Sequence, residues 1–457
     1  MHFAKPFAAL VAFAAPVALA APIALALVVL PAAAENRIDT IRPDAPELAA
    51  YGNLPVGVRT IELTDPGRVD VAGLEEAAPA EKPAELPKTD RKLTVEVFYP
   101  AADGASGSNT MTAPMRDGTP VELVGRSMRD AAVRKPDEAA RYPLVLISHG
   151  YPGNRFLLSH LAENLASKGY VVASIDHPAS TYTDMRAFGD TLLNRPIDQM
   201  FVLGEMERLG GEEGSFLQGI VDASNTGVIG YSMGGYGALI ASGAGITEAG
   251  ANFPYQNSYG APAAHVQGSD TQMKADPRVK TVVAFGPWGR NRNFWDENGL
   301  SQITLPVLLI AGSQDDVSGY EIGVQKIFEE MKGADRALLT YENANHNAGA
   351  PMPAPAEAVK AAKEAGTEAP WDHYGDAVWS NERMNNIAQH FVTAWLDRHL
   401  KGDEEKAKYL DLVADAQDGI VALEEDGVTR KGEHSYWEGF APRTAKGLRW
   451  ERRAAGE

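Results

Sequence analysis

Short apolar runs alternate with helix-like segments through the middle of this chain, and no other feature constrains its fold as strongly. The runs have the length and composition of strands that are buried on both faces of a sheet. They occupy residues 144–147, 170–175, 227–230, 279–285, 305–310 and 337–341. Apolar side chains at helical spacing occur at residues 157–165, 193–209 and 384–395. This alternation predicts an α/β fold, with a mostly parallel central sheet flanked by helices and interrupted by loop insertions.

The segment Gly-Tyr-Ser-Met-Gly-Gly, residues 230–235, directly follows one of these runs and precedes a helix-like stretch. Functional sites of such sheets lie beyond the carboxyl ends of the strands. The segment matches G-x-S-x-G, in which a serine occupies a sharp strand-to-helix turn and the flanking glycines prevent clashes. The helix N-terminus then helps to stabilise developing negative charge. The sequence therefore predicts Ser232 as a nucleophile, with a plain glycine-rich turn as the alternative.

A serine hydroxyl needs an adjacent base, and histidine is the usual one because it titrates near neutral pH. His346 lies in an Asn-rich loop after the late strand 337–341 and is the preferred candidate. His373, in the segment Trp-Asp-His-Tyr, is the second candidate. His149 is a weaker one, which we expect to shape its loop through a buried hydrogen bond. His390 and His399 fall in the last predicted helix, where we expect structural roles.

The base in turn needs a carboxylate, which fixes the imidazole tautomer and stabilises the imidazolium. Asp315 and Asp316 both follow the buried strand 305–310 within a few residues. Their position alone leaves both open as the acid of the site.

At these residues the chain resembles the branch of α/β-hydrolases that contains dienelactone hydrolases and platelet-activating-factor acetylhydrolases. The resemblance extends over about residues 92–402, and it implies hydrolysis of carboxylic esters or lactones through an acyl-serine intermediate. It also favours Asp315 as the acid, because family members use the carboxylate at this position of the loop, and Ser232, Asp315 and His346 then occur in the chain order expected for the fold. The matching segments are SHGYPGNR at 148–155, GYSMGG at 230–235, the Gly312–Asp315 turn and NANHN at 343–347.

The same resemblance indicates where an oxyanion would bind. One donor in this fold is the N–H group of the residue after the nucleophile, here Met233, and the other comes from the loop after an earlier strand. Pro152 has no N–H group and cannot donate. We therefore expect Tyr151 to supply the second donor, with Gly153 as the alternative.

The chain is also similar to polyester hydrolases, through His-Gly-Tyr at 149–151 and Phe-Gly-Pro-Trp at 285–288. In those enzymes a Trp at the equivalent place borders the acyl cleft, so Trp288 is a candidate for substrate contact; a core aromatic is the alternative. Two departures limit the likeness. True dienelactone hydrolases use Cys, which this chain lacks. The insertions at about 101–141, where we expect one short helix, and 350–380 are larger than in compact polyester hydrolases, and the second is a candidate lid.

The first 34 residues have the basic start, apolar core and small-residue end of a secretory signal. We predict cleavage after Ala34 and export to the periplasm or the medium, with no stable membrane insertion after processing. An uncleaved membrane anchor is the alternative, because the apolar run is long enough to span a bilayer. We divide the rest into an N-terminal segment, residues 35–91, with a strand and a Pro/Glu-rich loop, a catalytic domain, residues 92–411, and a tail, residues 412–457.

Composition excludes several other functions. With no Cys, the chain has no disulfides, thiolate nucleophiles or Cys-ligated metals. A net charge of −19 argues against nucleic-acid partners. Neither a metal motif nor a cofactor motif occurs, so we expect no metal, no cofactor, and a small-molecule or polymeric ester as the partner. A serine peptidase of the same fold usually needs a large gating domain, and no repeat suggests one. A non-catalytic binding protein of this fold remains the third hypothesis; the oligomeric state is not indicated.

Overall fold

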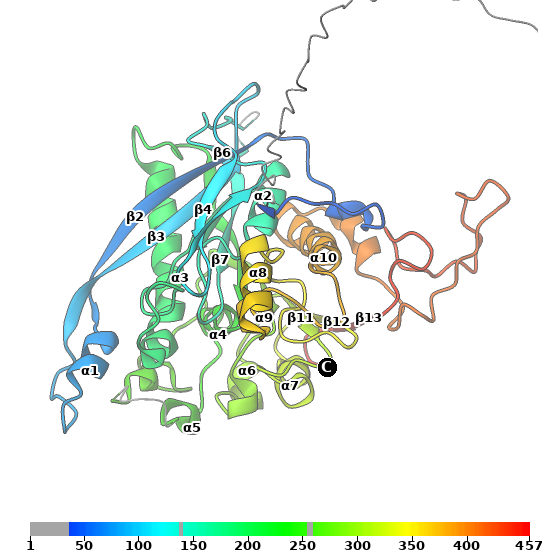
Figure 1. The fold of residues 1–457 in the computed structure, drawn as a ribbon. Helices are drawn as coiled ribbons and strands as arrows, with labels where there is room; N and C mark the ends of the chain where they lie inside the picture. Colours follow the sequence, from blue (N-terminus) through cyan, green and yellow to red (C-terminus); the bar gives the residue numbers. More distant parts are fainter. Residues whose placement is uncertain (1–35, 137–139, 254–258) are drawn as a thin grey trace, which may run out of the picture. The chain divides into compact units, whose positions relative to one another are not determined.

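The apolar runs of the sequence form neighbouring strands of one sheet in the computed structural model (Figure 1). The structure describes residues 36–136, 140–253 and 259–457. The strands of this sheet are β2 (Val56–Val69), β3 (Lys88–Pro100), β6 (Met128–Arg129), β7 (Tyr142–Ser148), β8 (Val171–Ile175), β9 (Val221–Tyr231), β10 (Val279–Phe285), β11 (Val307–Gly312), β12 (Arg336–Tyr341) and β13 (Leu448–Arg453). Their order is β13-β12-β11-β10-β9-β7-β8-β3-β2-β6. The six strands β7 to β12 are mutually parallel, and β2, β3 and β13 add antiparallel pairs. The predicted mostly parallel α/β sheet is confirmed.

Successive residues of the central strands face opposite sides of the sheet, so the sheet is buried on both faces. In β7, Val145 and Ile147 join one apolar core, and Leu144 and Leu146 join the other. Helices α2 and α10 pack in the first core, and α3, α4 and α7 in the second. The helices are α1 (Val71–Ala77), α2 (Ser159–Ser167), α3 (Phe188–Gly211), α4 (Met233–Ala241), α5 (Glu248–Ala251), α6 (Glu297–Leu300), α7 (Gln325–Glu330), α8 (Ala356–Ala365), α9 (Ala369–Asp372) and α10 (Asn381–Lys401).

Helix α10 is the long amphipathic helix that the sequence predicts. The side chain of Ser380 caps its first turn by accepting the N–H of Arg383, and Gly402 ends it with a φ of 66°. His390 on this helix is buried and accepts the N–H of Leu48 on its Nδ1 atom. Its role there is packing and hydrogen bonding within the fold, as expected.

The insertion at residues 101–141 differs from the expectation of one short helix. Its described part contains β4 (Thr110–Pro114) and β5 (Pro120–Val124), which form a small sheet with β1 (Asn36–Arg37) in the order β1-β5-β4. Buried and more exposed side chains alternate along both strands, with Met111 and Leu123 among the buried ones. This period of two is the signature of a half-buried strand, so the helix prediction was wrong for the described residues.

The segment 412–457, predicted as a tail, is part of the same compact unit, which comprises residues 35–457. Its strand β13 pairs antiparallel with β12 and completes one edge of the sheet. Trp450 of β13 stacks on Phe391 of α10, with ring centroids 5.0 Å apart, and donates its indole N–H to the Leu410 carbonyl. The predicted signal sequence, residues 1–34, lies outside the described residues. Within the described ranges, no helix is both long and apolar enough to cross a bilayer.

Candidate active site

Ser232 occupies the turn between the last residue of β9 and the first residue of α4. Its backbone has φ 53° and ψ −113°, a conformation that L-residues rarely adopt and that stores strain. Two glycines make this turn possible by allowing close backbone approach. A Cβ on Gly230 would lie 2.3 Å from the Gly234 carbonyl, and a Cβ on Gly234 would lie 1.9 Å from the Ser148 carbonyl oxygen. The serine therefore lies on the sharp strand-to-helix turn that its motif predicts.

Parallel pairing brings Asp315 and His346 to the same sheet edge, because they follow the carboxyl ends of the adjacent strands β11 and β12. His346 Nδ1 lies 2.9 Å from Asp315 Oδ2 and 3.0 Å from Oδ1. The Asp315 carboxylate also accepts the N–H groups of Val317 and Ser318, at 3.0 and 2.8 Å. Burial alone would raise the pKa of Asp315, but His346 and these N–H groups lower it below its ordinary value. Asp316 is exposed, so the geometry selects Asp315 as the partner of His346.

Ser232 and His346 line one cavity of about 240 Å³. A carboxylate that accepts from Nδ1 places the imidazole proton on that atom, which leaves Nε2 as the acceptor nitrogen of the ring. Among the described residues the Ser232 hydroxyl makes no hydrogen bond to this ring, and such contacts often tighten only when substrate binds. The remaining lining residues are Arg116, Tyr151, Tyr231, Asp316, Val317, Asn345, Asn347, Asp372 and His373.

The two expected oxyanion donors flank Ser232. Met233 is the first residue of α4, where helix N–H groups lack intrahelical acceptors. Tyr151 lines the cavity, and its ring packs edge-on against Phe188 at 5.0 Å. The alternative donor, Gly153, uses its N–H group for the Ser180 carbonyl at 3.2 Å. The Gly153 N–H is thus engaged within the fold, and Tyr151 as the second donor stays a prediction.

The other candidate bases have different surroundings. His149 is buried and hydrogen-bonds the Gly150 carbonyl at 2.7 Å through Nδ1, the loop-shaping contact expected of it. His373 lines the cavity, but it has no carboxylate partner among the described residues, and its Nε2 atom is buried without a hydrogen bond. Burial, together with the positive charge of Arg116 and His346, lowers the pKa of His373 to about 3. Of the histidines considered, His346 alone combines a carboxylate partner with the cavity.

Two polar cavity residues, Arg116 and Asn347, were not identified as site residues by the sequence analysis. Arg116 lies in the turn between β4 and β5, and its Nη1 atom is 3.6 Å from Asp372 Oδ1. Asn347 accepts the Tyr231 hydroxyl at 2.8 Å and donates to the carbonyls of Asp372 and Gly375 at 2.6 and 2.7 Å. No local motif identifies these residues, except that Asn347 directly follows the predicted base.

Trp288, the predicted substrate contact, is 7% exposed and is not among the cavity-lining residues. Its ring packs against Phe188, Phe294 and Tyr236 at centroid distances of 5.4, 5.0 and 6.2 Å. Its backbone N–H donates to the Ser232 carbonyl at 3.2 Å. This placement favours the core-aromatic alternative, and a substrate role for Trp288 stays a prediction.

Metal ligands do not gather at this edge of the sheet. Within residues 36–136, 140–253 and 259–457, no group of three or more His, Asp or Glu side chains is arranged to hold an ion.

Comparisons with known proteins show which proteins this chain resembles. Residues 132–258 match a family described as PETase, PET hydrolase-like; the range includes Ser232 and the loop before it. Cutinase est2 of Thermobifida alba is 25% identical over 212 residues, which are 46% of this chain and 55% of that protein. A bis(hydroxyethyl) terephthalate hydrolase of Streptomyces coelicolor is 23% identical over 204 residues, 44% of this chain and 49% of that protein. The chain thus spans about half the length of the curated relatives it matches.

A solved structure shares the fold over most of the chain. The ferulic acid esterase of Streptomyces cinnamoneus superposes with a TM-score of 0.50 at 22% identity, covering 78% of this chain and 94% of that one. Together with the strand order, this likeness confirms the α/β-hydrolase fold that the sequence motifs predict. The chain is an α/β-hydrolase, similar in its central residues to the PET-hydrolase-like family.

Proposed function

We propose that this protein hydrolyses carboxylic esters through an acyl intermediate on Ser232. The observation that carries the proposal is the hydrogen-bonded pair of Asp315 and His346. His346 lines the same cavity as Ser232, whose φ is positive. The names of its relatives support the class of reaction, because they are cutinases, a terephthalate ester hydrolase and a ferulic acid esterase.

In the proposed mechanism His346 takes the proton of the Ser232 hydroxyl as the oxygen attacks the ester carbonyl. Asp315 holds the ring and stabilises the imidazolium. The N–H groups of Met233 and Tyr151 donate to the oxyanion of the tetrahedral intermediate. His346 then protonates the departing alcohol, and the acyl group stays on Ser232. Water attacks this acyl ester with His346 as base, which releases the carboxylic acid and restores the hydroxyl.

We infer that the preferred substrates are small or polar esters. The cavity of about 240 Å³ lies below the size range typical of ligand pockets, about 300–1,000 Å³, and its lining is polar rather than apolar. Asn347 fixes the segment around Asp372 and Gly375 against the base loop, which restricts the opening. Long acyl chains and solid polymer are therefore expected to react more slowly than short soluble esters.

The experiment that tests this function compares the wild type with Ser232→Ala on p-nitrophenyl esters of graded acyl length. We expect wild-type turnover that is highest on short chains, and a loss of at least ~10³-fold in the variant. A fluorophosphonate probe should label the wild type and not the variant. Hydrolysis of a dipeptide anilide in preference to the esters would support the peptidase alternative. An unlabelled, inactive wild type would support a binding protein instead.

We also propose that the protein is exported. Residues 1–34 carry the signal-like pattern described above, and they precede the compact unit that begins at Glu35. The test is N-terminal sequencing of protein recovered from the cell envelope or the medium. A mature terminus at Glu35 is expected, whereas an intact Met1 in the membrane fraction would contradict the proposal.

A further inference from the structure

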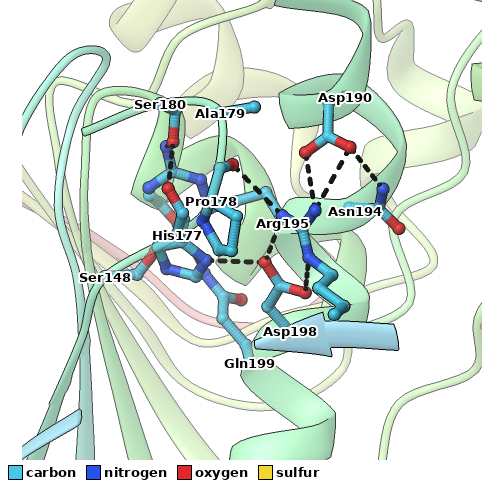
Figure 2. A network of polar contacts seen from close by, with 12 residues as sticks. Ser148, His177, Pro178, Ala179, Ser180, Asp190, Asn194, Arg195, Asp198 and Gln199 are labelled. Atoms are coloured by element: carbon cyan, nitrogen blue, oxygen red, sulfur yellow. Dashed lines mark hydrogen bonds and ion pairs between the residues drawn. The ribbon is translucent and has the colours of Figure 1, made fainter. Parts of the chain in front are cut away.

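A network of polar contacts includes the buried side chains of His177, Arg195 and Asp198 (Figure 2). Arg195 of α3 is its centre and is 1% exposed. It donates through Nη1 to the His149 carbonyl, and through Nη2 to the Gly150 carbonyl at 3.4 Å and the Ser180 hydroxyl at 2.8 Å. A buried guanidinium that binds two successive carbonyls of one loop fixes the path of that loop.

The Gly150 carbonyl matters because it belongs to the same peptide group as the Tyr151 N–H. A peptide group is planar and, when trans, directs its C=O and N–H in opposite directions. His149 Nδ1 at 2.7 Å and Arg195 Nη2 both bind the Gly150 oxygen, so the Tyr151 N–H points away from the network. Gly150 adjoins the nucleophile, since a Cβ built on it would lie 3.3 Å from Ser232 Cβ.

We propose that Arg195 is a positioning residue for the proposed hydrolysis, which holds the Gly150–Tyr151 peptide so that its N–H group faces the oxyanion. The inference rests on the proposed function and adds a specific residue to it. Hydrogen bonds to an amide oxygen also polarise the amide, which makes its N–H a stronger donor. Arg195 acts through the peptide and does not touch the substrate.

His149, the second hydrogen-bond donor to the Gly150 carbonyl, is itself held in one tautomer. The backbone N–H of His177 donates to His149 Nε2 at 3.2 Å. The His149 ring proton therefore lies on Nδ1, where it can donate to the Gly150 carbonyl. His177 in turn is bound by Asp198 at 3.0 Å through Nδ1 and by the Ser148 hydroxyl at 2.9 Å through Nε2. Each of these bonds restricts a ring whose rotation would release the loop.

Ser148, His177 and Asp198 have the bonding pattern of a Ser-His-Asp triad, but they serve here as a support. All three are at most 1% exposed, so no ester can reach the Ser148 hydroxyl. Burial and the positive charge of Arg195 lower the pKa of His177 to about 3, which keeps its ring neutral. Arg91 binds Asp198 at 2.8 and 2.9 Å and supplies the counter-charge of the buried carboxylate.

The test measures three variants on a short p-nitrophenyl ester and on a trifluoromethyl ketone, which forms a tetrahedral adduct with an active serine. For Arg195→Met we expect kcat to fall about 10- to 100-fold, which is no more than the fall expected when one oxyanion donor is removed. The Ki of the ketone should rise by a similar factor. KM should change less than about threefold. Arg195→Lys keeps the positive charge but cannot bind two carbonyls with a planar guanidinium, so its kcat should lie between those of Arg195→Met and the wild type. Arg208→Met, on the exposed face of the same helix, is the matched control and should match the wild type.

A structural role alone would lower the amount of active enzyme without changing the ketone Ki. Unchanged kcat and Ki in folded Arg195→Met would therefore overturn the proposal. If that variant does not fold, His149→Phe removes the other donor to the same carbonyl and must show the same joint change in kcat and Ki; an unchanged Ki there overturns the proposal as well. The wild-type and Ser232→Ala rates test the ester hydrolysis separately, so that failure of the proposed function is recognised independently.

Discussion

The Tyr231 hydroxyl donates a hydrogen bond of 2.8 Å to Asn347 Oδ1, and this buried contact joins the nucleophile strand to the base loop. Tyr231 immediately precedes Ser232, and Asn347 immediately follows His346. The Tyr231 ring also lies beside the His346 ring, with centroids 5.2 Å apart. This pair of side chains thus ties together the two segments whose Ser232 and His346 exchange a proton in the proposed mechanism.

Asn347→Ala is expected to weaken both the fold and the reaction. The substitution leaves the Tyr231 hydroxyl and the carbonyls of Asp372 and Gly375 without their partner, at a cost of about 1–3 kcal/mol in the free energy of unfolding. A small displacement of the base should lower kcat by at least about tenfold. Urea unfolding and ester kinetics measure both quantities. Tyr231→Phe keeps the ring, and should cost less on both counts; the reverse order would contradict this account.

Asp315→Asn tests the choice between the two neighbouring carboxylates. The amide removes the charge that stabilises the imidazolium and permits the wrong tautomer of His346, so kcat should fall by ~10³–10⁴-fold with KM nearly unchanged. Asp316→Asn changes only an exposed cavity residue and should alter kcat by less than about tenfold. The two variants are compared on one ester under the same conditions. Equal losses in both variants would show that Asp315 is not the specific partner.

The sequence predicted the parts of the fold that depend on local patterns. Apolar runs identified the central strands, and the spacing of Ser232, Asp315 and His346 placed each of them after a strand end. The edge strand β13 was missed because Leu448–Arg453 carries charged and apolar residues in a short segment, and only its pairing with β12 reveals its role. The strands β4 and β5 were missed because glycine and polar residues surround two runs of five.

The cavity walls were less predictable than the reacting groups. Arg116 reaches the site from a hairpin more than 100 positions before Ser232 in the chain, and only the tertiary fold brings it to Asp372. Arg195 and Asp198 look like polar positions on an amphipathic helix, although both are buried. Local motifs thus indicate the residues proposed to react, while long-range packing decides which side chains line the cavity and support them.

Acid should destabilise the protein because several histidines are buried in the neutral form. Burial lowers the pKa of His160, His177 and His390 to about 3, below the ordinary value of 6.5. Above pH 6.5 both folded and unfolded chains are neutral at these sites. Between about pH 6.5 and pH 3 only the unfolded chain gains the protons, so the free energy of unfolding falls as the pH falls, by up to about 1.4 kcal/mol per pH unit for each histidine.

His160→Leu isolates one of these contributions. His160 is 1% exposed, and both ring nitrogens lack a hydrogen-bond partner among the described residues. Removing the ring should leave stability at pH 8 unchanged or higher, because no bond is lost. It should also reduce the loss in the free energy of unfolding between pH 6 and pH 4 by the contribution of one buried histidine, which is up to about 1.4 kcal/mol per pH unit. Urea unfolding at pH 8, 6, 5 and 4 gives the slopes, and identical slopes in both proteins would exclude this role for His160.

Arg116→Ala should widen substrate choice without weakening the fold. The Arg116 and Asp372 side chains are 46% and 48% exposed, and an ion pair so exposed contributes about 0–1 kcal/mol to stability. Removing Arg116 takes a long side chain from the wall of the cavity, so bulkier acyl groups gain room beside Ser232. We expect kcat/KM on long-chain esters to rise several-fold relative to the acetate, with Tm within about 2 °C of the wild type. Arg208→Ala, which removes another exposed Arg that does not line the cavity, is the control. An unchanged or lower ratio of long-chain to acetate activity would mean that Arg116 binds the substrate rather than limiting its size.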